Sequence, residues 1–254
     1  MTYMTKEEIW AAALRQSAVD LNCSPEDFGR EHSVVVRSAP HAGARKYLSL
    51  PFFCDLVSYG GNVVASVAPE AEAAVRAYVE RYAPEHCFET PNMNVLADAL
   101  RPFGMAEYFL PDVSRMRQWD CGYALKVLGP ADFAGLYRPE WSNALCEKRR
   151  ELDVLAVGAY DGARLVGLAG CSADCESMWQ IGVDVLPGYR RRGVAAALTS
   201  RLAAETLARG KVPFYCAAWS NIKSVRNAVK CGFVPAWAEL TAKPEAFVRE
   251  LNGQ

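Results

Sequence analysis

Apolar residues recur at helical spacing in several stretches of the N-terminal half of the chain. The clearest is 70–82, where they fall at i, i+3, i+4, i+7, i+8 and i+11, from Ala71 to Tyr82. Residues 5–21 form a second such stretch, which begins with Thr5 and Glu8 in the order of a capping box. Residues 92–103 predict a third helix, and Ser24 with Pro25 marks a further helix start. Short apolar, valine-rich runs predict strands over 33–37, 47–57, 62–68, 87–89 and 106–116.

The C-terminal half alternates more regularly between strand and helix patterns. Strands are predicted over 123–128, 152–160, 165–170, 178–186, 212–218 and 233–241, and helices over 131–137, 142–148, 193–210 and 221–230. This order predicts an α/β fold of the α+β type, with a mixed sheet. The seam between the halves is expected near 117–120, which gives domains 1–120 and 121–254.

Composition and charge exclude several classes of protein. Half of the 254 residues are apolar (51%), which is enough for a sizeable core, and the net charge of −1 gives no general attraction to nucleic acid. No apolar run approaches the roughly 20 residues of a membrane helix, and the N-terminus lacks the pattern of a signal peptide. Nine scattered cysteines favour a reducing, cytoplasmic location. Cys171 and Cys175 have no second Cys or His pair near them in sequence, so no metal site is expected.

The stretch 183–198 carries the most specific chemistry. Val183 and Val185 favour a strand, Pro187 and Gly188 end it, and three arginines, Arg190, Arg191 and Arg192, precede a helix that Gly193 opens. The first turn of a helix has unpaired amides and a partial positive charge, and a glycine lets an anion approach the backbone closely. The stretch therefore predicts a phosphate or pyrophosphate site.

The form Arg190-x-x-Gly193-x-Ala195 resembles the pyrophosphate loop of the GNAT superfamily of acyl-CoA-dependent N-acyltransferases, which is Gln/Arg-x-x-Gly-x-Gly/Ala. A second match follows at the expected distance. Asn221-x-x-Ser224, followed by Gly232-Phe233, is similar to the Asn-x-x-Ala/Ser and Gly-Phe of that family. The order of elements from about 121 to 254 is also that of a GNAT domain, so the resemblance covers roughly half of the chain.

The resemblance implies acetyl-CoA, or another acyl-CoA, as co-substrate. The main chain of Val183 and Val185 would bind pantetheine, Asn221 and Ser224 would line the thioester end, and Arg190 and Arg192 would reach the phosphates. The amides expected to hold the pyrophosphate are those of Arg191, Arg192, Gly193, Val194 and Ala195. The implied acceptor is a small-molecule or amino-terminal amine, and a homodimer is a possible assembly. The alternative for the same stretch is a solvated basic helix cap.

The proton chemistry departs from the family pattern. Trp179 and Gln180 stand where many GNAT proteins have a glutamate, and Ala228 stands at the place of the usual tyrosine acid. Three candidate replacements follow. Glu176 could serve as base, with a solvated turn carboxylate as the alternative, and Asp184 has a packing or hydrogen-bonding role as its alternative. Ser224 is a small donor. Tyr215 is a further hydroxyl candidate, although a core role is its default. These departures keep a second function open, a CoA-binding regulatory or interaction module without transfer activity.

The first half repeats the order of the second in a shortened form. A strand near 63–68, Pro69, a helix, a predicted strand with Phe88, Asn92 and a helix parallel the elements around Pro187 and Asn221. Glu70 follows Pro69 directly, so the phosphate loop has no counterpart, and an acid there repels phosphate. We therefore predict either a degenerate GNAT-like lobe that does not bind CoA, or an unrelated α/β domain.

Overall fold

The computed structural model describes residues 4–97 and 99–254. They form two compact units, each built from two segments of the chain. Unit 1 comprises the described residues up to Ala12 together with Phe109–Pro235, and unit 2 comprises Ala13–Tyr108 and Ala236–Gln254. The predicted boundary at 120/121 separates the chain differently, because the C-terminal segment from Ala236 joins the N-terminal half. As a boundary between folding domains it stays a prediction.

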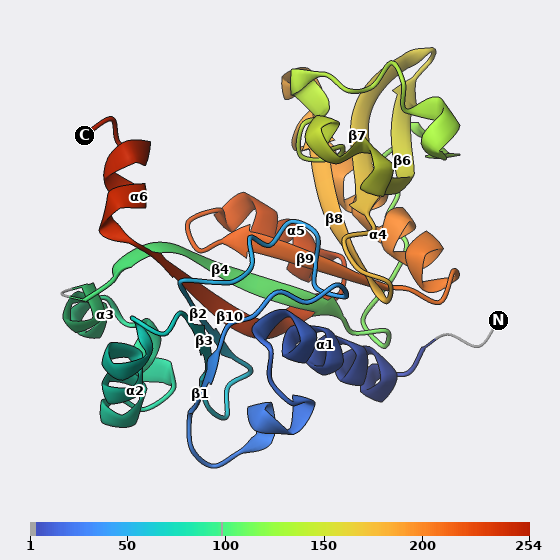
Figure 1. Ribbon diagram of the computed structural model, residues 1–254. Coiled ribbons are helices and arrows are strands. Elements are labelled where there is room, and N and C mark those ends of the chain that lie inside the picture. Colours follow the sequence, from blue (N-terminus) through green and yellow to red (C-terminus); the bar gives the residue numbers. More distant parts are fainter. Residues whose placement is uncertain (1–3, 98) are drawn as a thin grey trace. The chain divides into compact units, whose positions relative to one another are not determined.

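Unit 1 has a sheet whose strands follow the order β5-β6-β7-β8-β9 (Figure 1). Neighbours from β5 to β8 are antiparallel, and β8 and β9 are parallel. The elements are β5 (Ala124–Leu128), β6 (Asp153–Asp161), β7 (Arg164–Ser172), β8 (Met178–Val185), α4 (Val194–Leu207), β9 (Val212–Ala218) and α5 (Ile222–Lys230). Helix α4 packs on β6, β7 and β8 and buries Val194, Leu198 and Leu202 against them. The opposite face is covered by the segment 129–152, whose Trp141 and Leu145 pack on Ala156 and Leu168.

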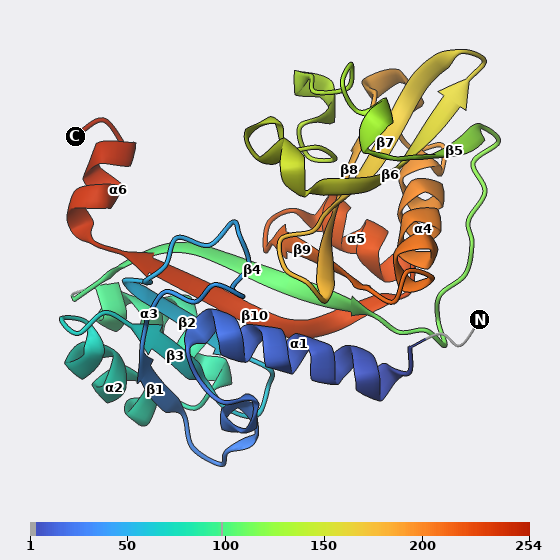
Figure 2. The same ribbon diagram turned by 45° about the vertical axis from the view of Figure 1, so that its right-hand side comes forward.

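The strands of unit 2 follow the order β1-β3-β2-β10-β4, with both parallel and antiparallel neighbours (Figure 2). Its strands are β1 (Val34–Arg37), β2 (Cys54–Ser58), β3 (Val64–Val67), β4 (Arg101–Pro111) and β10 (Phe233–Lys243). Its helices are α1 (Lys6–Leu21), α2 (Glu72–Arg81), α3 (Thr90–Ala97) and α6 (Glu245–Leu251). The core on one face joins β2, β3 and β10 to α2 and α3. By the division into units, α1, β4 and β10 each contribute residues to both.

Most predicted elements are confirmed within a few residues, and the exceptions cluster at prolines. The predicted strand over 47–57 starts only at Cys54, because Pro51 lacks the amide that a strand interior needs. The helix predicted over 92–103 ends at Ala97, since Pro102 favours an extended conformation at Arg101, where β4 begins. The strand predicted over 87–89 is wrong, because after Pro84 the residues Glu85–Phe88 form a 3₁₀ turn.

The two helices predicted between β5 and β6 are also wrong. The chain there makes three short 3₁₀ turns, Pro130–Asp132, Pro139–Trp141 and Glu147–Leu152. Proline starts the first two, and Arg149 has non-helical dihedral angles inside the third. Over the residues that the structure describes, no helix combines the length and the apolar character needed to cross a membrane.

Candidate functional site

The turn before α4 presents its backbone as an anion-binding concavity. Arg191 and Gly193 both have positive φ, 64° and 82°, and a short 3₁₀ turn, Pro187–Tyr189, leads into them. Left-handed residues on either side of Arg192 are typical of the anion-binding turns called nests, and we use that name for the turn Arg191–Gly193. Gly193 is the N-cap of α4 and offers no side-chain acceptor, so the first amides of the helix add to the same positive end.

The arginine side chains around this turn are held at its edges. Arg190 donates from Nε to the carbonyl oxygen of Val185 at 3.0 Å, and Arg192 donates to the hydroxyl of Tyr123 at 3.1 Å. The guanidinium of Arg192 also lies 5.6 Å from the ring centre of Tyr189. All three arginines are exposed. The turn therefore combines helix-start amides with exposed positive charge, which suits a pyrophosphate.

β8 and β9 are paired only over the first part of β8. The two strands pair in parallel at three positions, the last of which is Gln180 with Phe214, and β8 then continues to Val185. On its other side β8 stays paired with β7 up to Val185. Beyond Gln180, β8 thus has main-chain groups that β9 does not use. We call this opening the fork; it can accept the amide groups of an extended ligand such as pantetheine.

Asp184 ties the covering segment of unit 1 to β8. Its carboxylate accepts from the Asn143 amide at 2.8 Å, the Asn143 side-chain Nδ2 at 2.6 Å and the Ala144 amide at 3.0 Å. Two paired glycines make room for this contact, because a Cβ on Gly182 would lie 1.7 Å from the Asn143 carbonyl oxygen and one on Gly170 would lie 2.0 Å from that of Ala144. This is the hydrogen-bonding role that was the alternative for Asp184; its catalytic role stays a prediction.

The other two candidate catalytic residues lie in different surroundings. Glu176 precedes β8, at the end opposite the nest; its side chain is exposed, and its carbonyl oxygen accepts from Lys211 at 2.8 Å. The hydroxyl of Ser224, on α5, lies 2.9 Å from the Tyr215 hydroxyl on β9. Burial raises the pKa of Tyr215, although the hydrogen bond from Ser224 acts in the opposite direction. Asn221 caps α5 and accepts from the Ser224 amide at 3.3 Å. The structure thus brings Asn221, Ser224 and Tyr215 together and leaves Glu176 apart.

A row of polar side chains that the sequence did not reveal crosses the sheet to the fork. Asp153 pairs with Ser172 across β6 and β7, and Ser172 pairs with Gln180 across β7 and β8. Directly paired residues point to the same face, here the face covered by residues 129–152. Asp153 is 2% exposed and accepts from the Cys146 amide at 2.9 Å. Burial raises the pKa of Asp153 to about 6, and the bond from Cys146 partly offsets this effect.

The polar row ends beside a thiol. Gln180 Nε2 lies 2.9 Å from the sulfur of Cys216, two residues beyond the last pair of β8 and β9. The hydroxyl oxygen of Ser172 is buried without a hydrogen-bond partner among the described residues. No spacing along the chain links Asp153 to Ser172 and Gln180, because the strand register that joins them is a property of the folded sheet.

The nest follows the end of β8, the fork opens along β8, and Asn221 caps α5 directly after β9. Within residues 4–97 and 99–254, no cluster of three or more His, Cys, Asp or Glu side chains is arranged to hold a metal ion.

A family model described as GNAT acetyltransferase matches residues 109–237, slightly more than half of the chain. The chain belongs to the GNAT acetyltransferase family. The matched segment coincides with the C-terminal segment of unit 1 to within two residues at its end.

Solved structures of GNAT proteins resemble this GNAT chain at low sequence identity. A GNAT-family protein from Novosphingobium aromaticivorans is 24% identical, with a TM-score of 0.42; the similarity covers 56% of this chain and 66% of that one. A GCN5-related N-acetyltransferase from Kribbella flavida is 15% identical, with coverage of 94% and 98% and a TM-score of 0.44. A tandem GNAT protein from the clavulanic acid biosynthesis pathway is 13% identical, with coverage of 95% and 97% and a TM-score of 0.44. No curated protein matches the chain.

Proposed function

We propose that unit 1 transfers an acyl group, in the simplest case acetyl, from acyl-CoA to a primary amine. The observation that carries this proposal is the nest at Arg191–Gly193 at the end of a strand that has already separated from β9 at Gln180. A phosphate site alone would suit many ligands. A phosphate site joined to an opened strand suits an extended ligand that has negative charge at one end and amide groups along its length. Acyl-CoA is such a ligand.

The transfer needs three things from the protein: a donor for the developing oxyanion, an acceptor for the proton of the amine, and a proton for the leaving thiolate. Main-chain amides of β8 beyond Gln180 are the candidate oxyanion donors. The paired hydroxyls of Ser224 and Tyr215 are the candidate proton donor, in place of the tyrosine missing at Ala228. Direct attack by the amine needs no covalent intermediate on the enzyme.

Asp153 is a further candidate proton acceptor, beside Glu176 and Asp184. Asp184 already accepts three hydrogen bonds, and Glu176 is exposed at the far end of β8. Asp153 lies two strands from the fork, about 10 Å by the usual strand spacing. Because the Ser172 hydroxyl between them has no hydrogen-bond partner among the described residues, a proton would have to reach Asp153 through bridging water molecules. A pKa of about 6 lets this carboxylate accept a proton at neutral pH and release it again.

The second candidate function is a CoA-binding module without transfer activity. The observation that favours it is the replacement of the family's glutamate and tyrosine by Gln180 and Ala228. Both functions require CoA binding, and only the first requires turnover.

Two measurements test the proposal in order. Thermal unfolding with and without acetyl-CoA should show stabilisation of about 2.7 kcal/mol once the ligand reaches about 100 times its dissociation constant. Release of free thiol from acetyl-CoA is then followed across a panel of primary amines. Stabilisation with no turnover for any amine would select the binding module, and an absence of stabilisation at millimolar CoA would contradict both functions.

A further inference from the structure

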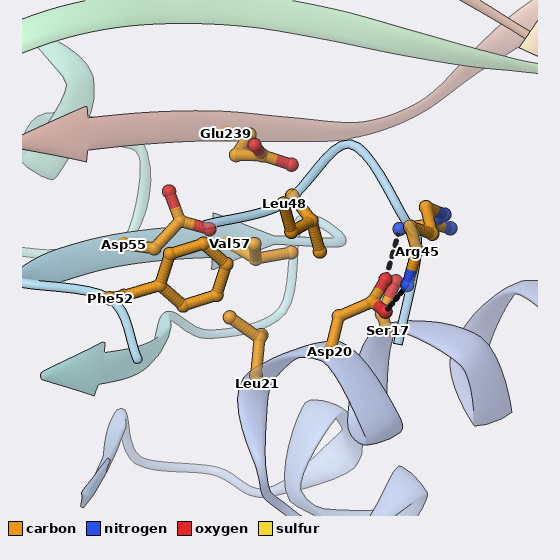
Figure 3. A pocket seen from close by; sticks show the side chains of 9 residues that line it. All are labelled: Ser17, Asp20, Leu21, Arg45, Leu48, Phe52, Asp55, Val57 and Glu239. Atoms are coloured by element: carbon orange, nitrogen blue, oxygen red, sulfur yellow. Dashed lines mark hydrogen bonds and ion pairs between the residues drawn. The ribbon is translucent and has the colours of Figure 1, made fainter. Parts of the chain in front are cut away.

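Unit 2 contains a pocket that the acyl-transfer proposal does not use (Figure 3). The pocket spans about 230 Å³ of empty space, which includes open solvent. Its enclosed part has room for about one water-sized group. Helix α1, the loop before β2, and strands β2 and β10 form its walls. The lining residues are Ser17, Asp20, Leu21, Arg45, Leu48, Phe52, Asp55, Val57 and Glu239.

One acid in the pocket is already neutralised. Asp20 forms a buried ion pair with Arg45, whose backbone amide also donates to Asp20 Oδ1 at 2.9 Å. Gln16 donates to the same oxygen at 2.9 Å. The side chains of Asp20 and Arg45 are 4% and 3% exposed. This pair therefore satisfies itself and leaves no net charge for a ligand.

The other two acids have no cation paired with them within residues 4–97 and 99–254, although Glu239 accepts a hydrogen bond from Tyr108. Glu239 pairs with Val57 and Thr241 with Asp55 in the β2–β10 register, so Asp55 and Glu239 are diagonal neighbours on one face of the sheet. Among the described residues neither carboxyl group forms an ion pair. Asp55 is 2% exposed, and only its Oδ1 accepts a hydrogen bond, from the Thr241 hydroxyl at 2.8 Å. Its Oδ2 has no hydrogen-bond partner in the described part of the chain, and Figure 3 shows the carboxyl group at the pocket wall below Glu239.

Two adjacent buried carboxyl groups do not both ionise freely. Burial raises the pKa of Asp55 well above its ordinary value, and the charge of Glu239 raises it further. Burial also raises the pKa of Glu239, against the opposing effect of Arg45. Without a cation, the pair therefore holds a proton to higher pH than isolated carboxyl groups do.

We propose that the pocket binds a primary ammonium group between Asp55 and Glu239. The ammonium supplies N–H donors for Oδ2 of Asp55 and for Glu239. Its –NH3+ head is about the size of the one water that the enclosed part holds, and its carbon chain would lie in the open part of the pocket. The carboxyl groups are not part of a set able to hold a metal ion within the described residues. Leu48 and Phe52, on the same pocket wall, give the carbon chain of an alkylamine an apolar surface. The site needs nothing from acyl transfer, so either proposal can fail alone.

Binding of this cation has a defined pH dependence. An ammonium group favours the ionised form of both acids, so binding releases the proton that the pair holds, and affinity rises with pH until the amine itself deprotonates. The charged and titratable groups around the pair are Asp20, Arg45, Tyr59, Tyr108 and Lys243. Burial raises the pKa of Tyr59 beyond the range of the experiment, and Asp20 and Arg45 neutralise each other. The pair itself thus sets the pH response.

The test is thermal unfolding of the full chain in methylammonium chloride between pH 6 and 9. Sodium chloride and tetramethylammonium chloride at the same ionic strength are the reference salts, since the second has the same charge without N–H donors. We expect methylammonium to raise Tm by roughly 5 °C or more at saturation, more at pH 8.5 than at pH 6. Neither reference salt should do so. Equal shifts in all three salts would overturn the proposal.

Variants separate this site from any amine site in unit 1. Asp55→Asn keeps the shape of the side chain and should weaken methylammonium binding at least tenfold, whereas Glu80→Gln, an exposed acid on α2, should leave it unchanged. An unaltered response in Asp55→Asn would refute the assignment. Should that variant fold poorly, carboxyl ¹³C resonances of the unaltered protein give a second measurement. Methylammonium must then shift the titration of Asp55 to lower pH, and an unmoved titration contradicts the site.

Discussion

Helices α4 and α2 start in similar contexts and with opposite electrostatics. Each follows a strand and a proline: Val185 and Pro187 precede α4, and Val67 and Pro69 precede α2. Before α4 the chain inserts a left-handed turn that frees the helix amides, and no acid lies in the first turn of the helix. Before α2 no such turn exists, and Glu72 opens the helix in an ion pair with Arg37 at 3.0 Å. The positive end of α2 thus already has its anion.

The strands that lead into these helices, β8 and β3, differ in how completely they are paired with their neighbours. β3 is paired on both sides over its full length, with β1 and with β2 from Val64 to Val67. β8 keeps one partner and is released by the other after Gln180. A strand paired on both sides has no main-chain groups for a ligand. Two features are therefore needed together for a CoA site, a nest and an opened strand, and unit 2 has neither at the equivalent place.

The largest expected effect comes from closing the nest. Gly193→Glu places a charged side chain where φ is +82° and where the phosphates would lie. We expect the stabilisation by acetyl-CoA, about 2.7 kcal/mol at 100 times the dissociation constant, to disappear. Thermal unfolding with and without the ligand measures it.

Gly210→Glu is the matched control for that experiment. Gly210 also has a positive φ, 69°, and lies beyond the other end of α4 with no atom near its missing Cβ. It should lower Tm through the same backbone strain and retain the ligand-induced shift. If both variants lose the shift, or both keep it, the nest is not the binding element.

The sequence predicted this nest because its components are consecutive in the chain. Arg190, Gly193 and Ala195 are local, and so are Asn221 and Ser224 at the start of α5. The positive φ of Arg191 was not predictable, since arginine has no preference for that conformation. Asp153 and Ser172 were missed because residues that meet only through strand register leave no spacing signal.

The errors in the fold have two causes, one local and one long-range. Pro51, Pro84 and Pro102 redirect the chain locally, and periodicity alone does not register this effect. The C-terminal segment from Ala236 packs with the N-terminal half because Ala238–Ala242 pair with β2, a contact between residues far apart in sequence. The degenerate-lobe hypothesis stays a prediction: strand, proline and helix recur in order, but the counterpart of β9 is the 3₁₀ turn Glu85–Phe88.

The next largest effect is expected from the polar row that leads to the opened strand β8. Asp153→Asn removes the only acid in the row and should lower the transfer rate by about 10²-fold, with loss of the acid limb near pH 6 from the pH–rate profile. CoA-induced stabilisation should remain, so binding and turnover separate. Asp132→Asn, an exposed acid in the covering segment, is the control. A profile that keeps its limb in Asp153→Asn would exclude Asp153 as the proton acceptor.

Stability gives an independent check on this carboxyl group. Because its folded pKa of about 6 lies above the unfolded value of about 3.9, the native state binds more protons between these values. The contribution of Asp153 to stability therefore falls as pH rises from about 4 to 6. Asp153→Asn should flatten the dependence of Tm on pH in that window; an unchanged slope would contradict the raised pKa.

A smaller effect is expected from the arginines around the nest. Arg192→Ala should weaken CoA binding by about tenfold, because one charge-assisted contact at an exposed site contributes about 1.4 kcal/mol. The loss should shrink as salt is raised, since exposed charges are screened. Arg209→Ala, at the opposite end of α4, should leave the dissociation constant unchanged. Titration calorimetry at two salt concentrations measures the dissociation constants of both variants. An equal loss of affinity in Arg192→Ala and Arg209→Ala would show that the arginines act only through overall charge.

The smallest effect tests unit 2. Glu72→Gln removes the acid at the start of α2, which accepts from Arg37 and Arg76. Those hydrogen bonds lower the pKa of Glu72, so its contribution to stability is present at neutral pH and is lost as pH falls below the unfolded value of about 4.3. We expect Tm to fall by at most a few degrees at pH 7 and by less at pH 3.

The same variant tests whether Glu72 alone prevents unit 2 from binding CoA. If the acid alone kept CoA from α2, its removal would raise the stoichiometry from one CoA per chain toward two. We expect the calorimetric stoichiometry to stay at one, because β3 remains paired on both sides and no left-handed turn precedes α2. A second CoA bound to Glu72→Gln would show that a helix start without an acid is sufficient for CoA binding. The opened strand of unit 1 would then not be required for binding.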